Sequence, residues 1–244
     1  MPSDVTAWTS STATDQGPRQ EMADAARTYW NPMNGRLSWA VADGIGDHCD
    51  AADAADLAVF EATRVATTAG AAAGITEART VLRSRYGGEK APLWLGGDCV
   101  MVAAVAMSDR VGGGFEIAWV GDCRAYVIQD GTLRQVTEDH TQAEEWRHSE
   151  HEGLRAIADT AEHIVTRSVR SAQPIATVRV LGQVERLMLC TDGLSKYLDA
   201  GTIAHILAAD ASPRWMSRAL VAATRRRLRA RDNIAVTVLA PRTP

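Results

Sequence analysis

Residues 119–141 have the sequence WVGDCRAYVIQDGTLRQVTEDHT, and this stretch carries the clearest fold signal in the chain. Its β-branched and aromatic residues predict strands at Arg124–Ile128 and Thr132–Val136, joined by an Asp-Gly turn of the kind that closes two-residue hairpins. A further strand is expected at Phe115–Val120, just before Gly121. We therefore predict that the middle of the chain is an antiparallel meander.

More strands are expected on both sides of this stretch, at Leu37–Ala42, Cys99–Met107, Ala176–Leu181, Arg186–Cys190 and Ile234–Leu239. Helices are expected in three places: the alanine-rich stretch Ala51–Ala73, Thr76–Tyr86, and a segment that Ser212-Pro213 opens and that runs to about Arg229. Strands therefore come in clusters with helices between them, which favours an α+β fold of antiparallel sheets with helices on their outer faces.

The composition is that of one ordinary globular domain, which we expect to span residues 1–244. The polar segment 142–170 is predicted to form a surface helix and a mobile flap. A net charge of −4 gives no general attraction to nucleic acid or to an anionic membrane. The longest apolar run, Cys99–Met107, is too short to span a membrane, and the N-terminal residues do not resemble a secretory signal. We expect a cytoplasmic monomer whose four cysteines are reduced core thiols.

Three aspartates lie at the ends of expected strands, each beside a small or turn-forming residue: Asp43 in WAVADGIGD, Asp192 in LMLCTDGLS and Asp232 in RARDNIAV. A carboxylate at a strand end is held rigidly, and an adjacent glycine allows a ligand to approach the backbone closely. Oxygen ligands of this kind are preferred by Mg²⁺ and Mn²⁺. One Asp-Gly pair alone is more typical of a plain turn.

The order of these motifs resembles the metal-dependent protein phosphatase family (PPM, type 2C). RQEMAD at 19–24 is similar to the family's R-x-x-x-E-D opening, and VADGIGD at 41–47 to its D-G-x-G-G segment. The stretch at 119–141 resembles V-G-D-S-R-x-Y…G…L-T-x-D-H almost position for position. HIVTRSV at 163–169, LMLCTDGL and RDNIAVTVL match the later family motifs. The resemblance implies a four-layer α-β-β-α sandwich, with two central antiparallel sheets flanked by helices.

The resemblance also implies roles for individual residues in hydrolysing phosphoserine and phosphothreonine in proteins. Asp43 would bridge two Mn²⁺ or Mg²⁺ ions, with the Gly44 carbonyl on one of them, and Asp192 and Asp232 would bind the other. The two ions would activate a water molecule, and Arg19 would hold the substrate phosphate. Asp24, Asp139 and Asn233 would have supporting roles, whereas Asp122 and Arg124 are expected to be structural.

Several positions depart from the family pattern. Ala23 stands where a glutamate is usual, so the second ion is expected to bind weakly. Ile45 leaves no histidine beside Asp43, so water would protonate the leaving group. Asp47 is either an extra carboxylate near the site or an exposed turn residue. Lys196 replaces an aspartate that, with a counterpart of Asp139, would hold a third ion. We expect that third site to be absent, with Lys196 either occupying its space or lying solvated at a helix start.

Two other functions stay open. A pseudophosphatase or phosphoprotein-binding module would keep the fold and lose turnover, for which Ala23 is the main argument. Nucleic-acid binding through the arginine-rich segment Arg214–Arg231 is opposed by an apolar stripe on the same segment, comprising Trp215, Met216, Ala219, Leu220 and Ala223. The alanine- and arginine-rich composition suggests a GC-rich bacterial genome, in which the partners would be phosphoproteins of a serine/threonine kinase pathway.

Overall fold

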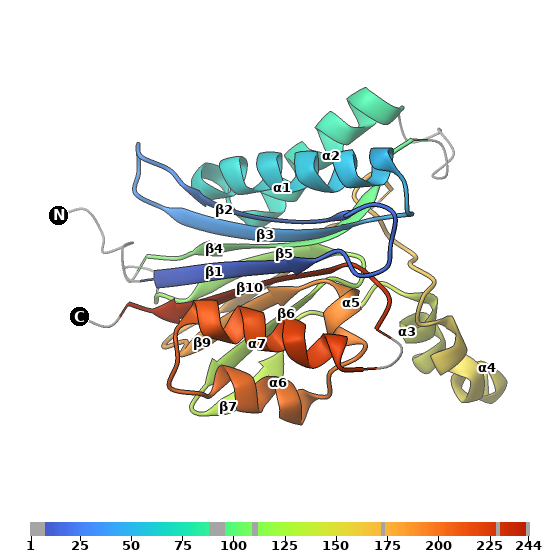
Figure 1. The fold of residues 1–244 in the computed structure, drawn as a ribbon. Helices are drawn as coiled ribbons and strands as arrows, with labels where there is room; N and C mark the ends of the chain where they lie inside the picture. Colours follow the sequence, from blue (N-terminus) through green and yellow to red (C-terminus); the bar gives the residue numbers. More distant parts are fainter. Residues whose placement is uncertain (1–7, 88–95, 109–111, 172–173, 228–229, 243–244) are drawn as a thin grey trace.

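The computed structural model describes residues 8–87, 96–108, 112–171, 174–227 and 230–242, which form a layered α+β sandwich (Figure 1). Two five-stranded sheets face each other, and helices cover the outer face of each. Every pair of neighbouring strands is antiparallel. The predicted four-layer α-β-β-α architecture is therefore confirmed.

The ten strands found among the described residues divide equally between the sheets. The first sheet contains, in spatial order, β2 (Asp24–Trp30), β3 (Leu37–Gly44), β4 (Cys99–Ala106), β5 (Phe115–Val120) and β8 (Ala176–Val180). The second contains β1 (Trp8–Asp15), β10 (Ile234–Pro241), β9 (Arg186–Cys190), β6 (Arg124–Gln129) and β7 (Thr132–Gln135). Strands from the beginning and end of the described chain thus lie side by side, since β1 pairs with β10.

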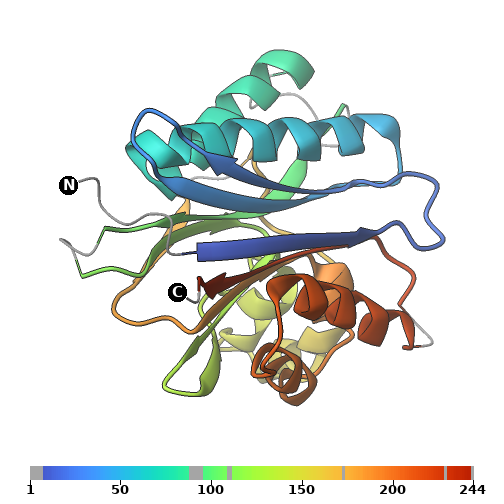
Figure 2. The ribbon, with the colours of Figure 1, turned by 60° about the vertical axis from the view of Figure 1, so that its left-hand side comes forward.

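The helices form two outer layers, one on each side of the sheets (Figure 2), and one group that projects from the sandwich (Figure 1). The first sheet is covered by α1 (Cys49–Ala69) and α2 (Ala71–Tyr86), and the second by α5 (Asp192–Ser195), α6 (Ala200–Leu207) and α7 (Pro213–Arg225). The short helices α3 (Gln142–Arg147), α4 (Glu152–Ile157) and η3 (Ala158–Ala161) project from one end of the sandwich. In the described part of the chain, no helix has both the length and the apolar character needed to cross a lipid bilayer.

Strand β4 shows how the layers are held together, because all eight of its residues are buried. Side chains alternate between the two faces of a strand. Met101 and Val105 accordingly pack into the cluster beneath α1 and α2, whereas Val102 and Ala104 pack into the core between the sheets. A strand with two buried faces is continuously apolar, which explains why the run at Cys99–Met107 predicted it well.

Small residues let the first helical layer approach closely. The buried face of α1 is mostly alanine, and all of the following are fully buried: Ala51, Ala54, Ala55, Ala58, Ala62 and Ala66. On α2, a Cβ atom added at Gly74 would lie 2.4 Å from the carbonyl oxygen of Ala62. The alanine stretch is therefore a packing surface, and Gly70 separates the two helices within it.

The predicted meander is wrong at one connection. The hairpin of β6 and β7 is present, and both Asp130 and Gly131 have positive φ, as a type I′ turn requires. However, β5 pairs with β4 and β8 in the first sheet, whereas β6 pairs with β7 and β9 in the second. The chain crosses between the sheets at residues 121–123. The sequence did not distinguish this crossing from a hairpin, because a short turn between two buried strands suits both equally well.

Two strands were not predicted from the sequence. β1 and β2 are edge strands of their sheets, and many of their residues are only partly buried. Their sequences, WTSSTATD and DAARTYW, consequently lack the apolar character that marks the central strands. Whether a segment pairs as an edge strand depends on the strand beside it, so edge strands are hard to predict from their own sequences.

The predicted start of α7 is confirmed, since the Ser212 hydroxyl accepts a hydrogen bond from the Trp215 backbone N–H and Pro213 lies in the first turn. Met216 and Leu220 are fully buried, but Trp215 is 52% exposed and does not belong to the buried stripe. The helix ends at Arg225, earlier than the expected end at about Arg229, which itself lies outside the described residues. Of the cysteines, which are all free, Cys99, Cys123 and Cys190 are buried and Cys49 is exposed, so Cys49 is not a core thiol.

Because α1 and α2 are in close contact, a glycine-to-alanine substitution between them should destabilise the protein and not stabilise it. Gly→Ala inside a helix normally stabilises by up to ~1 kcal/mol. Gly74→Ala should instead destabilise, by roughly 1–3 kcal/mol, because the new methyl group meets the Ala62 backbone. The matched control is Gly153→Ala in α4, where an added Cβ meets no atom within 4 Å. Urea unfolding of both variants checks this, and equal stabilisation would contradict the packing described for α1 and α2.

Candidate functional site

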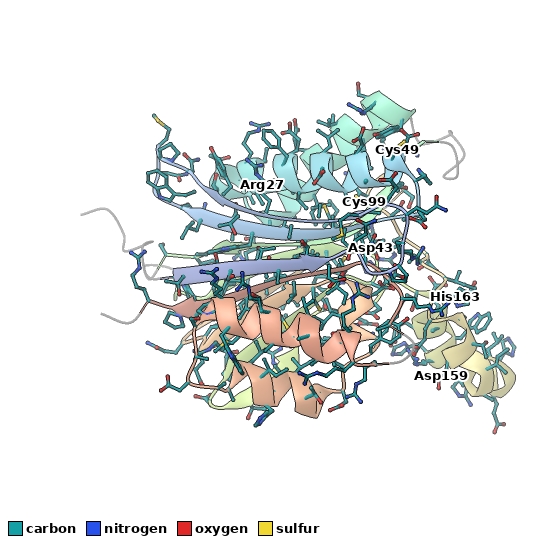
Figure 3. The ribbon with its side chains drawn as sticks, viewed as in Figure 1. Arg27, Asp43, Cys49, Cys99, Asp159 and His163 are labelled. Atoms are coloured by element: carbon teal, nitrogen blue, oxygen red, sulfur yellow. The ribbon has the colours of Figure 1, made fainter. Side chains whose placement is uncertain are left out.

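Carboxylates from both sheets meet at one end of the sandwich. In the first sheet, Asp24 of β2 lies directly opposite Asp43 of β3 in the strand register. In the second sheet, Asp192 begins α5 just after β9, and Asp232 comes shortly before β10. Figure 3 shows Asp43 between the sheets, at the end from which α3 and α4 project. Antiparallel neighbours β9 and β10 bring the end of one and the start of the other together, so residues distant in sequence become neighbours.

Asp43, Asp192 and Asp232 line a cavity of about 220 Å³. Six of the predicted site residues line it, namely Arg19, Asp43, Gly44, Asp192, Asp232 and Asn233. The remaining lining residues are Ile45, Gly46, Val100, Asp122, His163 and Val165. Asp24 and Asp139, which we expected in supporting roles, do not line the cavity.

Two of the aspartates, Asp43 and Asp192, are followed by a glycine that allows another backbone segment to approach closely. A Cβ atom at Gly193 would lie 1.9 Å from the carbonyl oxygen of Asn233, so a larger residue would push the start of α5 away from the start of β10. A Cβ atom at Gly44 would lie 2.4 Å from the carbonyl oxygen of Ala51. Both glycines therefore serve to bring backbone segments together at the cavity.

The buried carboxylates repel one another. Burial, followed by the charges of Asp24, Asp192 and Asp122, raises the pKa of Asp43 well above its usual value. Burial is also the main reason that the pKa of Asp24 rises to about 7, with Asp192 and Asp232 adding to the effect and a hydrogen bond from the Thr191 hydroxyl opposing it. Crowded carboxylate oxygens of this kind are the ligands that a hard divalent cation such as Mg²⁺ or Mn²⁺ prefers.

Arg19 contacts this carboxylate group from the rim. Its Nη2 atom donates a hydrogen bond to Asp232 Oδ2 at 2.8 Å, and its side chain is 39% exposed. The loop that carries it is held at two points. Asp47 accepts hydrogen bonds from the backbone N–H groups of Gln20 and Glu21, so its role is to hold this loop.

Asn233 provides the second attachment of the Arg19 loop. Its Oδ1 atom accepts a hydrogen bond from the Ala23 N–H at 2.8 Å, and its Nδ2 atom donates to the Gln16 carbonyl at 2.7 Å. Both ends of the loop are thus tied to the residue next to Asp232. The Ala23 methyl group is buried and offers no oxygen to the cavity.

Asp122 was expected to be structural, but it lines the cavity and is joined to the carboxylate group by Lys196. The Lys196 ammonium lies 2.6 Å from Asp192 Oδ2 and 2.9 Å from Asp122 Oδ2. Burial of Asp122, with a contribution from Asp192, raises its pKa to about 6 in spite of the nearby ammonium. The crossing of the chain between the sheets at residues 121–123 delivers Asp122 to this position, and the sequence carries no sign of that crossing.

Asp139 has a different partner. Both of its carboxylate oxygens accept hydrogen bonds from Arg124, with distances of 2.6–3.1 Å, and the two side chains are largely buried. This bidentate pair ties the end of the β6–β7 hairpin region to β6. Asp139 therefore holds Arg124, and Asp122 is the carboxylate that lies beside Asp192 and Lys196.

The segment predicted as a surface helix and flap consists of the short helices α3, α4 and η3 and the strip that returns to the cavity. Arg147 joins it internally through ion pairs with Glu144, Asp159 and Glu162. A bridge between Thr141 and Val165 attaches its base. His163 and Val165 then line the cavity, so this segment contributes directly to its wall, a role that we did not assign to His163 from the sequence.

A second group of potential metal ligands lies in a neighbouring hollow of about 260 Å³. Glu138, Glu144 and His148 bring one ligand atom each to within 4.8 Å of one another. Glu144 already pairs with Arg147, and the His148 side chain is 68% exposed. The group therefore has the character of a solvated surface network.

Comparison with known proteins identifies the family. The family model described as Protein phosphatase 2C matches residues 11–232. A curated relative, "Serine/threonine phosphatase stp" of Listeria welshimeri, is 34% identical over 111 residues. That alignment covers 44% of this chain and only 42% of the relative's length.

Solved structures share the fold. The S. agalactiae serine/threonine phosphatase has a TM-score of 0.79 and 20% identity, with 96% of this chain and 99% of that one covered. The catalytic domain of the serine/threonine protein phosphatase PstP, solved in complex with two manganese ions, has a TM-score of 0.77 and 21% identity, with 97% and 99% covered. At these identities the likeness establishes the common architecture.

The contact of His140 with the turn that carries Asp122 should make the stability of the protein depend on pH. His140 Nδ1 accepts a hydrogen bond from the Gly121 N–H at 3.1 Å, and burial, with a contribution from Arg167, lowers the His140 pKa to about 4. The unfolded chain binds a proton below about pH 6.5, where the folded protein does not. The free energy of unfolding should therefore fall as the pH drops from about 6.5 to about 4.

His140→Asn keeps an acceptor near Nδ1 and removes the titration. Between pH 7.5 and pH 5, the wild-type protein should lose about 1 kcal/mol more stability than this variant, after allowance for the partly exposed ring. Urea unfolding in the presence of a chelator measures the difference. Equal losses in the two proteins would show that His140 is not the group responsible.

Proposed function

This chain belongs to the protein phosphatase 2C family, and we propose on that basis that it hydrolyses phosphate monoesters of serine and threonine in proteins with the help of two divalent cations. One observation carries the proposal: Asp43, Asp192, Asp232 and Arg19, from four separate segments, line a single cavity. Carboxylates suit a cation pair, and a guanidinium suits a phosphate.

The donor set fits the proposed Mn²⁺ or Mg²⁺ ions. Asp43 would hold both ions, with the Gly44 carbonyl as a further ligand of one, and Asp192 and Asp232 would complete the other. Asp24 would support the set by its position opposite Asp43, and Asn233 by holding the Arg19 loop. Bound ions would supply Lewis acidity, which lowers the pKa of water and offsets charge on the phosphoryl oxygens.

Arg19 would change partners during the reaction. Its present bond to Asp232 uses an oxygen that a cation would also attract. If a cation took that place at Asp232, the guanidinium would be free to bind two phosphate oxygens in a bidentate manner. Asp47 and Asn233 keep the loop in place while this exchange occurs, because they hold its backbone and not the side chain.

The leaving serine or threonine alkoxide needs a proton. Ile45, next to Gly44 at the cavity, is 42% exposed and has no proton to give. Water remains our proposal for the donor. The partner proteins would be phosphoserine or phosphothreonine substrates. The exposed Ile45 side chain, which lines the cavity, offers an apolar surface on which a residue flanking the phosphate could pack.

The main test is Mn²⁺-dependent hydrolysis of p-nitrophenyl phosphate and of a phosphothreonine peptide. Asp43→Asn should lower kcat/KM at least about a hundredfold, since even residues outside the ligand set of a metal site commonly contribute 10–100-fold. Asp159→Asn, which removes a carboxylate that is 89% exposed on η3, should retain wild-type activity. A wild-type protein that binds Mn²⁺ and the phosphopeptide but hydrolyses neither substrate would favour the phosphoprotein-binding alternative. The observation that supports this alternative is the buried methyl group of Ala23, which provides no oxygen for a metal ion.

The role proposed for Arg19 is tested separately. Arg19→Lys keeps the charge but loses the planar pair of donors, so KM for the phosphate ester should rise about tenfold while kcat changes less. Mn²⁺ binding, followed by calorimetry, should be unchanged or slightly tighter because Asp232 loses a competing partner. An unaltered KM in the presence of saturating Mn²⁺ would contradict direct contact between Arg19 and the phosphate.

A further inference from the structure

Lys196 places a fixed positive charge inside the carboxylate group. Its ammonium lies 2.6 Å from Asp192 Oδ2 and 2.9 Å from Asp122 Oδ2. The side chains of Lys196, Asp192 and Asp122 are only 20%, 17% and 3% exposed. Lys196 is therefore not the solvated helix-start residue that was one of the two sequence interpretations.

This contact differs from an ordinary ion pair on a helix surface. Lys196 follows Asp192 by four residues, a spacing that often gives weak surface pairs. Asp122, however, comes from the crossing between the two sheets and is almost fully buried. Within the part of the chain that the structure describes, Lys196 is the one donor that reaches the Asp122 carboxylate. Without it, Asp122 would be a buried charge with no compensation, which is strongly unfavourable.

Both ends of the bridge are fixed by backbone hydrogen bonds. The Lys196 N–H donates to the Asp192 carbonyl at 3.0 Å, which holds the two residues on one helical turn. On the other side, Gly121 exchanges hydrogen bonds with His140: its N–H donates to Nδ1, and its carbonyl accepts from the His140 N–H. The ammonium thus lies in a preformed space between two carboxylates and does not swing freely from the surface.

The chemistry of an ammonium decides what this space can hold. A protonated amine donates hydrogen bonds and offers no lone pair, so it cannot ligate a cation and repels one. It uses Oδ2 of both aspartates. A divalent ion could bind between Asp122 and Asp192 only by displacing it. The bond to Lys196 leaves the second oxygen of Asp192 to serve a cation in the cavity that Asp192 lines together with Asp43 and Asp232.

We propose that Lys196 is a built-in cation of the site, which positions Asp192 and excludes a divalent ion from the space between Asp122 and Asp192. The inference rests on the proposed function, because it assumes that Asp192 serves a cation pair at the cavity. Lys196 is a positioning residue in this scheme. The ammonium limits the centre to two ions and aims the free oxygen of Asp192 at them.

The test is the stoichiometry of Mn²⁺ binding, measured by calorimetry and by electron paramagnetic resonance of free Mn²⁺. Wild-type protein should bind two ions per chain. Lys196→Asp, which adds a carboxylate where the ammonium lies, should bind one additional ion, and so should the neutral Lys196→Met, with lower affinity. Arg64→Met removes a half-exposed cation from α1 and should bind two ions like the wild type.

The outcomes separate the two proposals. Three ions on the wild-type protein, or two ions with unchanged affinity on Lys196→Met and Lys196→Asp, would overturn the role of Lys196. Absence of Mn²⁺ binding by the wild-type protein would refute the proposed function, and this inference with it. The wild-type stoichiometry needs no variant, so the proposal can still fail if a Lys196 variant does not fold.

Discussion

Mutual repulsion among buried carboxylates is the constraint around which this molecule is arranged. Asp24 and Asp122 are buried within one end of the sandwich, Asp43 is half-buried there, and Asp192 and Asp232 lie beside them. Holding like charges together in a low dielectric costs free energy, so the fold must hold their backbones firmly. Two packed sheets do this well, because each aspartate belongs to a strand end or a short turn that the core fixes. Hydrogen bonds donated by Thr191, Lys196 and Arg19 to three of these carboxylates then stabilise the group further.

The sequence predicted the parts of this arrangement that have a local cause. Continuous apolar runs marked β4 and β9, the Asp-Gly pair at 130–131 marked a type I′ turn, and Ser212-Pro213 marked the start of α7. The three strand-end aspartates were also visible, because each lies beside a small or turn-forming residue. The family resemblance supplied their order and the expectation that they converge.

Other parts depend on contacts between distant segments and left no local trace. Asp122 and Lys196 are 74 residues apart, and nothing near either residue indicates that the chain crosses between sheets at residue 121. The pair of Arg124 and Asp139 likewise looked like two motif residues and not one interaction. Edge strand β1 exists because β10 offers it a partner. In each case the missing information was which sheet a segment joins, and packing of the whole chain decides that.

The order of strands in the second sheet has a consequence for how the protein is made. β10 is the last strand of the described chain, yet it lies between β1 and β9 in the interior of the sheet. During synthesis, β1 and β9 therefore lack the strand that pairs with both of them until residues 234–241 have left the ribosome. Asp232 arrives with that same strand. A nascent chain consequently has no complete set of carboxylates, and the group can assemble only at the close of translation of this region.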